Sequence, residues 1–101
     1  AAEWRVRRPS EPAADLAMAL AIAGARLKRS LPPGMAVLGE VGLGGEVRPV
    51  SGIEGRLHEA RRLGYRRIAM AGSEGVEPAR IEVVETKTVA EAINLLEARP
   101  G

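Results

Sequence analysis

The chain has 101 residues, a formal net charge of +2 and no cysteine, and its only histidine is His58. A chain of this length forms a single domain with one modest core. The lack of cysteine excludes disulfides and thiolate metal sites, and one histidine supplies neither a histidine-rich metal site nor an ordinary catalytic triad. We therefore expect one domain over residues 1–101, with no metal or cofactor site of its own.

The longest apolar run, residues 16–23, is much shorter than a membrane-spanning helix, which needs about 20 residues. The first residues also lack the basic, apolar and cleavage segments of a secretory signal in their usual order. These features predict a cytoplasmic protein that makes no contact with a membrane.

The charged residues are unevenly distributed along the chain. Residues 1–67 carry 12 basic and 7 acidic side chains, whereas residues 68–101 carry 3 and 6. A basic half on a nearly neutral domain is typical of a surface that faces phosphate. The other interpretation, equally open at this point, is that the arginines border a subunit interface or solvate helix faces.

The first predicted elements are a short strand and a long helix. Residues 4–7, Trp-Arg-Val-Arg, alternate apolar and basic side chains, which predicts a strand with Trp4 and Val6 facing inward. Ser10 is placed to cap a helix over residues 13–27. That helix is apolar on nearly all sides, and a helix of this kind is buried.

A hairpin is predicted next. Residues 35–41 indicate a buried strand and residues 46–50 its return, and the glycines between them suit a tight turn. Glu40 and Glu46 fall at exposed or edge positions of this hairpin. We expect solvated or salt-bridging carboxylates there rather than a catalytic pair.

The second half of the chain alternates helices and strands. Residues 67–71 and 81–84 are predicted strands, joined by a surface loop. This order predicts an α+β fold, an α/β sandwich in which about three helices pack against a mixed sheet. The helix over residues 53–63 ends at Gly64 and has Ile53, Leu57 and Leu63 on its core side. In the last helix Thr88 and Glu91 form a capping box, and the buried side chains are Val89, Ala92, Ile93 and Leu96.

Three strings follow one another in a fixed order. They are EPAADLAMALAIA at residues 11–23, GEVGLGGEVRPV at residues 39–50 and RLHEARRLGY at residues 56–65. Together they resemble the C-terminal Lon-protease-like domain of the RadA (Sms) family of bacterial DNA repair proteins. The resemblance covers nearly the whole chain and implies a Lon-protease-like fold, similar to the second domain of a small-subunit ribosomal protein.

The resemblance also implies a longer protein. Members of the family carry a zinc finger and an ATPase core upstream, and neither motif occurs in this chain. We therefore expect an isolated or trimmed C-terminal domain of a larger ATPase. ATP, magnesium and zinc are then expected only in the missing upstream domains. The chain has no Walker-type string, and its glycines lie in a hairpin, which is not the context of a dinucleotide fingerprint.

Active Lon peptidases pair a serine at a helix start with a lysine that follows a Gly-Gly. By the resemblance, the serine position here is Ala13 and the lysine position is Glu54. A methyl group cannot attack a carbonyl, and a carboxylate cannot replace the amine that activates a serine. We therefore expect no peptidase activity. Asp15 is expected to accept a backbone hydrogen bond or to interact favourably with the helix dipole. His58 is expected to be a surface residue.

Arginines concentrate between residues 48 and 67. The guanidinium group binds phosphate through two parallel hydrogen bonds. Trp4 and Tyr65 are the only aromatic residues, so stacking on bases has little support. Contact with DNA is therefore expected to be non-specific and to involve the phosphate backbone. The candidate DNA-binding residues are Arg48, Arg56, Arg61, Arg62, Arg66 and Arg67.

The sequence thus predicts a catalytically inactive Lon-like scaffold that contacts DNA. Its parent is expected to be a nucleoid-associated, ring-forming ATPase of the RadA type that remodels branched DNA. Self-association is expected because the first helix and the hairpin offer more apolar surface than a small sheet covers. The alternative is a residual Lon-like serine peptidase domain, or a domain of another Lon-related ATPase such as a magnesium-chelatase-like competence protein.

Overall fold

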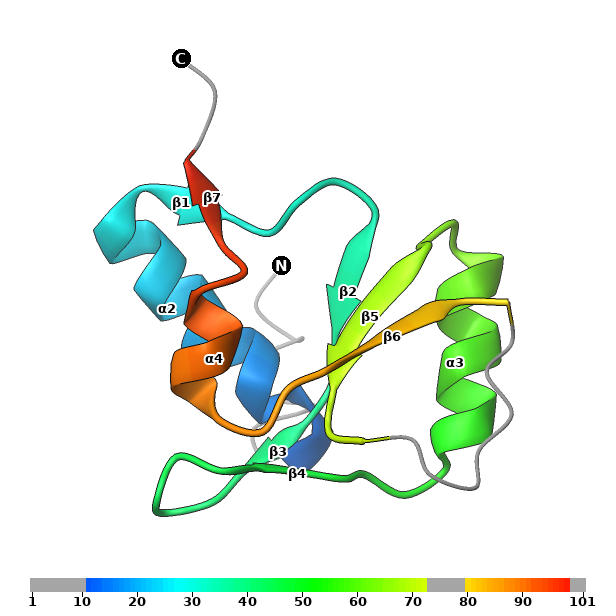
Figure 1. Cartoon of the computed structure of the whole chain (residues 1–101). Helices are drawn as coiled ribbons and strands as arrows, with labels where there is room; N and C mark the ends of the chain where they lie inside the picture. Colours follow the sequence, from blue (N-terminus) through cyan, green and yellow to red (C-terminus); the bar gives the residue numbers. More distant parts are fainter. Residues whose placement is uncertain (1–10, 73–79, 99–101) are drawn as a thin grey trace, which may run out of the picture.

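A computed structural model of the chain describes residues 11–72 and 80–98, which form an α+β fold. Figure 1 shows two helices, α2 and α4, on one side of a small sheet and α3 on the other. The strand predicted at residues 4–7 and the cap predicted at Ser10 lie outside the described residues. In chain order the elements are η1 (Pro12–Ala14), α2 (Asp15–Leu27), β1 (Arg29–Ser30), β2 (Met35–Val37), β3 (Glu40–Val41), β4 (Val47–Arg48), α3 (Ile53–Arg62), β5 (Arg67–Met70), β6 (Glu82–Glu85), α4 (Val89–Ile93) and β7 (Glu97–Ala98).

The strands of the described residues form three separate small sheets. The largest has the order β2-β5-β6 and is parallel throughout. Two antiparallel pairs, β3 with β4 and β1 with β7, stand apart from it. The predicted mixed sheet does not occur among the described strands, because their parallel and antiparallel pairings belong to different sheets. The pairing of β1 with β7 had no signal in the alternation of apolar residues, since all four of these residues are exposed.

The strand predicted over residues 35–41 is split in two at Gly39. The backbone N–H of Gly39 donates to the Ala13 carbonyl at 3.1 Å, and the Leu16 N–H donates to the Gly39 carbonyl at 3.0 Å. A Cβ atom at residue 39 would lie only 2.8 Å from the Val47 side chain. Because residue 39 is glycine, the start of the first helix can form backbone hydrogen bonds with it. The chain leaves the parallel sheet after β2 and continues as β3, which pairs with β4.

Two cores lie on opposite sides of the parallel sheet. On the α2 side Leu16 and Leu20 pack with Ala92 and Leu96. The prediction that the first helix is buried on all sides is wrong. Met18 and Ile22 are 64% and 65% exposed, because the sheet and α4 cover only one face of α2. On the α3 side the buried core consists of Leu57, Ala60, Ile68, Met70 and Ile81.

Helix α3 confirms its predicted start and stop. It begins at Ile53 and ends at Arg62, and Gly64 follows with a φ of +99°. Leu63 was predicted to face the core but is 60% exposed. Leu63 follows the last helical residue, Arg62, as the C-cap of the helix, so it leaves the stripe of residues that faces the core.

The capping box predicted at the start of the last helix is confirmed, but the helix is shorter than predicted. The N–H of Glu91 donates to the Thr88 hydroxyl at 3.1 Å, and the Glu91 carboxylate accepts from the Lys87 N–H at 2.9 Å. Helix α4 ends at Ile93, so Leu96 is buried outside the helix. The chain straightens there because Glu97–Ala98 pairs with β1.

Leu57→Ala tests whether the α3 side of the sheet holds the domain together. Leu57 is fully buried at 0% exposure, so the change is expected to lower the free energy of unfolding by about 2–5 kcal/mol. Leu63→Ala on the same helix is the matched control, with an expected change within about 0.5 kcal/mol. Urea denaturation followed by circular dichroism measures both. Equal losses for the two variants would contradict this description of the core.

Candidate functional site

A polar pocket of about 280 Å³ lies where the start of the first helix meets β3 and the loop before α3. Its walls come from three separate stretches of the chain, which only the fold brings together. Pro49 and Val50 supply apolar surface, while carboxylates, a hydroxyl and a guanidinium supply polar groups. The described lining residues are Glu11, Pro12, Ala13, Glu40, Pro49, Val50, Ser51 and Arg56.

Backbone bonds hold the first helix against this pocket. Ala13, 7% exposed, lies in η1, and its carbonyl accepts from Gly39 next to Glu40. The Asp15 carboxylate accepts from the N–H of Val41 at 3.2 Å. Asp15 therefore has the predicted role of a backbone hydrogen-bond acceptor, but its donor is 26 residues away rather than adjacent. This bond fixes β3 beside the start of α2.

The two positions of the expected dyad are not equivalent in the structure. The methyl group of Ala13 lines the pocket, whereas Glu54 is exposed on the first turn of α3 and does not line it. Among the described lining residues, Ser51 carries the only hydroxyl, and none is lysine or histidine. Ser51 was assigned to a turn by the sequence, which gave no sign that it shares a pocket with Ala13.

Arg56 belongs to this pocket. Its Nε donates to the carbonyl of Ser51 at 3.0 Å, and its Nη1 lies 3.8 Å from a carboxylate oxygen of Glu11. The side chain thus joins two walls of the pocket, which favours a structural role over free contact with DNA.

Arg48 lies elsewhere, on the hairpin. Its Nη2 is 2.9 Å from the Glu46 carboxylate, which also accepts from the N–H of Gly44 at 3.1 Å. The backbone N–H of Glu46 itself and the Arg48 guanidinium lower the pKa of the Glu46 carboxyl group. Glu46 is therefore a salt-bridging carboxylate, as predicted, within one hairpin. Glu40 makes no ion pair within residues 11–72 and 80–98.

Arg62 is paired with an acid on its own helix. Its Nε donates to the Glu59 carboxylate at 3.0 Å, and a second bond to the same carboxylate makes the pair bidentate. The Arg62 guanidinium lowers the pKa of Glu59, and Glu59 raises the pKa of Arg62. The charge of Arg62 is thus matched locally. His58, nearby on the helix, is exposed as predicted.

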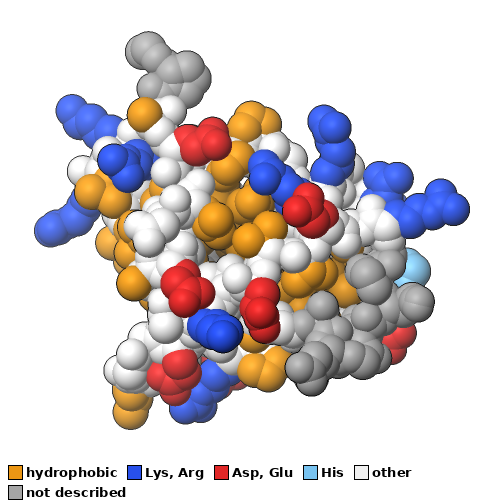
Figure 2. Space-filling view, viewed as in Figure 1, with side chains coloured by type: hydrophobic (Ala, Val, Ile, Leu, Met, Phe, Trp, Pro, Cys, Tyr) orange, Lys and Arg blue, Asp and Glu red, His pale blue; other side chains and the backbone are white. Residues whose placement is uncertain are grey.

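Three of the six candidates make no ion pair in the described part of the chain. They are Arg61, Arg66 and Arg67, here called the α3-end arginines. They lie where α3 ends and β5 begins, and the backbone N–H groups of the latter two both donate to the Gly34 carbonyl. Figure 2 shows basic side chains projecting from this upper right part of the molecule. The six candidates therefore fall into three places rather than one patch.

No cluster of three acidic, histidine or cysteine side chains suited to a metal ion occurs in residues 11–72 and 80–98. Within the same ranges no helix has the length and apolar character needed to cross a membrane.

The chain matches a known family. A family model described as "Subunit ChlI of Mg-chelatase" matches residues 8–74, so the chain belongs to this family. The DNA repair protein RadA of Synechocystis sp. is 46% identical over 82% of this chain and 17% of that protein. The RadA proteins of Aquifex aeolicus and Mycobacterium tuberculosis are 37% and 36% identical over 85% and 88% of this chain. These relatives confirm the resemblance to RadA, and the chain spans less than a fifth of their length.

Arg62→Gln tests the ion pair between Arg62 and Glu59, which neutralises the charge of one candidate DNA-binding residue. Without the guanidinium, the pKa of Glu59 is expected to rise toward its ordinary value. Because the folded-state pKa is lowered, the pair stabilises the fold above the ordinary pKa of glutamate, and this contribution is lost as the pH falls through the lowered value. NMR titration of the Glu59 side chain measures the change. Glu46, which depends on Arg48, is the internal control, and an unmoved Glu59 titration contradicts the pairing.

Proposed function

We propose that this chain is a catalytically inactive Lon-like domain that serves as a scaffold and a DNA-contacting surface in a RadA-type DNA repair protein. The observation that carries the proposal is that Ala13 lines the pocket, since by the resemblance this position corresponds to the serine of Lon peptidases. The similarity to RadA proteins over most of the chain supports the assignment to that type of repair protein.

The chemistry of the pocket supports the loss of peptidase activity. Acyl transfer by a serine needs a base within hydrogen-bond reach of the hydroxyl. Glu54, at the expected lysine position, is an exposed carboxylate outside the pocket, and the guanidinium of Arg56 is a hydrogen-bond donor with no acceptor for a proton. What the fold keeps is the packing of helix start, hairpin and α3, which suits a scaffold.

The α3-end arginines are the part of the surface that best suits DNA. Their charges are not neutralised by described acids, in contrast to those of Arg48 and Arg62. They lie on a loop and at element ends, where side chains reach solvent without disturbing the core. Each guanidinium binds a phosphate in a bidentate manner, so three of them provide weak contact without sequence preference.

The parent protein is proposed to be a nucleoid-associated ring ATPase that remodels branched DNA, with ATP, magnesium and zinc bound in domains outside this chain. Self-association is supported by the exposed face of α2, where Met18 and Ile22 present apolar surface to solvent. A ring multiplies weak contacts with DNA, because each added copy binds at a high effective concentration.

One observation favours a second candidate function. Ser51 lines the same pocket as Ala13, so among the described residues it is the serine best placed to act as a residual Lon-like nucleophile. A further version of the alternative is another Lon-related ATPase, in line with the family model named after a Mg-chelatase subunit. The native sequence upstream separates these ATPases: a four-cysteine zinc finger followed by a RecA-like core supports the RadA type.

We expect no peptidase activity, since the pocket pairs no hydroxyl with a lysine or histidine among its described residues. Incubation with unfolded casein and with a serine-reactive probe measures this. Ser51→Ala is the matched variant, expected to behave like the unmodified chain. Turnover that persists through purification and disappears in Ser51→Ala contradicts the proposal and establishes the peptidase alternative.

Replacing all three α3-end arginines with glutamine is expected to weaken DNA binding. Each lost phosphate contact lowers the salt slope by about 0.9, so the triple variant loses up to about 2.7. The assay uses the full-length protein on branched DNA over a range of salt concentrations, with ATPase activity followed in parallel.

The control for this experiment removes the same charge elsewhere. Replacing Arg26, Lys28 and Arg29, all exposed at the end of α2, with glutamine leaves the α3-end arginines intact. A surface-specific contact predicts that only the first triple variant changes the slope. Equal effects in both variants indicate a general dependence on net charge, and no effect in either assigns the arginines to an interface or to solubility.

A further inference from the structure

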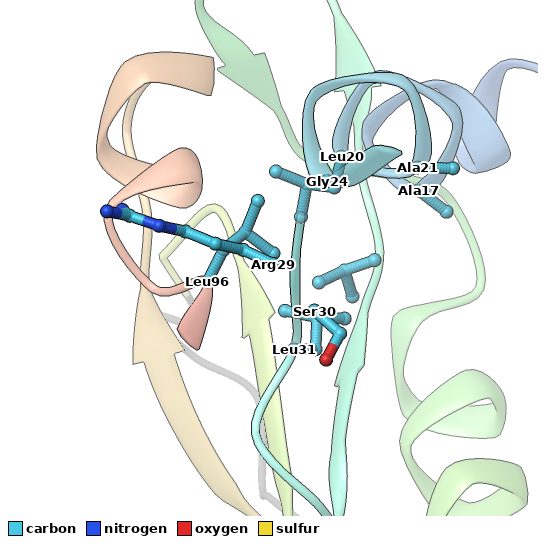
Figure 3. A pocket seen from close by; sticks show the side chains of 9 residues that line it. Ala17, Leu20, Ala21, Gly24, Arg29, Ser30, Leu31 and Leu96 are labelled. Atoms are coloured by element: carbon cyan, nitrogen blue, oxygen red, sulfur yellow. The ribbon is translucent and has the colours of Figure 1, made fainter. Parts of the chain in front are cut away.

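Apolar hollows lie beside β2 on both faces of the parallel sheet, and they differ in the groups around them. On the α2 side a hollow of about 230 Å³ lies between the helix, β1 and Val37. Figure 3 shows Ala17, Leu20 and Ala21 along one side of it, while the charged end of Arg29 extends away. No aromatic side chain occurs among its described lining residues, so this hollow indicates no particular ligand.

The hollow on the other face, here called the α3 hollow, contains the only tyrosine of the chain in its wall. Its volume is about 240 Å³, and the buried residues Ala60 and Ile68 belong to its lining. Tyr65 and Leu63 also line it and are 38% and 60% exposed. An aromatic side chain that is partly open to solvent therefore stands beside an apolar hollow.

Backbone hydrogen bonds hold Tyr65 at this place. Its N–H donates to the carbonyl of Ala60 at 3.0 Å, in a turn that passes through Gly64 with a φ of +99°. The N–H groups of Arg66 and Arg67 donate to the Gly34 carbonyl at 2.9 and 3.2 Å. The backbone on both sides of the tyrosine is thus fixed before a ligand arrives, which reduces the entropy lost on binding.

The α3-end arginines flank Tyr65 in the chain, and no acid among the described residues forms an ion pair with them. The α3 hollow itself is lined by two charged side chains that are already paired. Arg56 is 3.8 Å from a carboxylate oxygen of Glu11, and Glu59 accepts a hydrogen bond from Arg62. The charge left to attract a ligand is therefore positive and lies at the Tyr65 end.

A ligand that fits this arrangement combines a flat apolar ring with negative charge. Single-stranded nucleic acid has both, since its bases stack on aromatic side chains and its phosphates bind guanidinium groups. A base inside an intact duplex is covered by its neighbours and cannot reach a hollow in a protein surface.

We propose that the α3 hollow binds a base of single-stranded DNA, which stacks on Tyr65 while the α3-end arginines bind the adjoining phosphates. This inference rests on the proposed contact with DNA and names the form of DNA that the surface selects. The site does not read the identity of the base, because every base has a face that can stack. The low number of aromatic residues gave stacking little support in the sequence, but one ring suffices where the fold places it beside a hollow and three arginines.

An oligomer of thymidine and an abasic oligomer of the same length separate stacking from phosphate contact, because both carry the same backbone charge. NMR titration of the 101-residue chain with each oligomer measures both affinities and follows the Tyr65 ring resonances. We expect the thymidine oligomer to bind about 5- to 150-fold more tightly, the range that corresponds to one stacked base. Only this oligomer is expected to shift the Tyr65 ring resonances.

Two substitutions of the same residue isolate the role of the ring. Tyr65→Leu removes the ring and keeps an apolar side chain, and Tyr65→Phe, the matched control, keeps the ring. We expect Tyr65→Leu to bind the two oligomers equally and Tyr65→Phe to retain the preference for thymidine. Replacing the α3-end arginines with glutamine is expected to weaken the binding of both oligomers. Circular dichroism of each variant confirms that the fold is retained.

The outcomes distinguish this inference from the DNA contact on which it rests. Equal affinity of the unmodified chain for both oligomers overturns the stacking site, and if the arginine variant still weakens both, the DNA contact stands. A preference for thymidine that persists in Tyr65→Leu also overturns the inference, because the base then binds elsewhere. Binding of neither oligomer overturns the stacking site and the DNA contact together, and the α3 hollow is then a site for a protein segment.

Discussion

The pair of backbone hydrogen bonds between Gly39 and the start of the first helix is the constraint on which the rest of this structure depends. The Gly39 N–H reaches the Ala13 carbonyl at 3.1 Å, and the Leu16 N–H returns to the Gly39 carbonyl at 3.0 Å. These bonds end β2, redirect the chain into β3 and place the helix start beside the hairpin. The Asp15 carboxylate adds a bond to the N–H of Val41 at 3.2 Å. A side chain at residue 39 would collide with Val47, so this joint requires glycine.

The same joint holds the walls of the pocket together mainly through backbone atoms. It brings Ala13, Glu40 and Ser51 to one pocket, and the bonds that do so are made by backbone atoms, apart from the anchoring Asp15 carboxylate. Backbone bonds do not depend on which side chain occupies residue 13. The packing of helix, hairpin and α3 therefore does not require a nucleophile at that position, which is compatible with the proposed scaffold role.

Pairing between residues close in sequence decides which surface arginines have a neighbouring acid, and the overall composition of the chain does not show this. Glu46 and Glu59 each hold an arginine two or three residues away, and both carboxyl groups have a lowered pKa. Exposed pairs of this kind add little to stability, but they decide which guanidinium groups have an acid beside them. The three arginines at the end of α3 have none among the described residues, so no salt bridge there offsets their positive charge.

The sequence by itself determined the α+β class, the extent of α3, the capping box at Thr88 and the RadA relationship, because helix stops, caps and family strings are read from neighbouring residues. It did not determine the split at Gly39, the pairing of β1 with β7 or the exposed face of α2. Those features depend on which distant segments meet, and apolar periodicity does not encode the partner. For the same reason, only the tertiary structure decided that Ser51 shares a pocket with Ala13 and that six neighbouring arginines lie in three separate places.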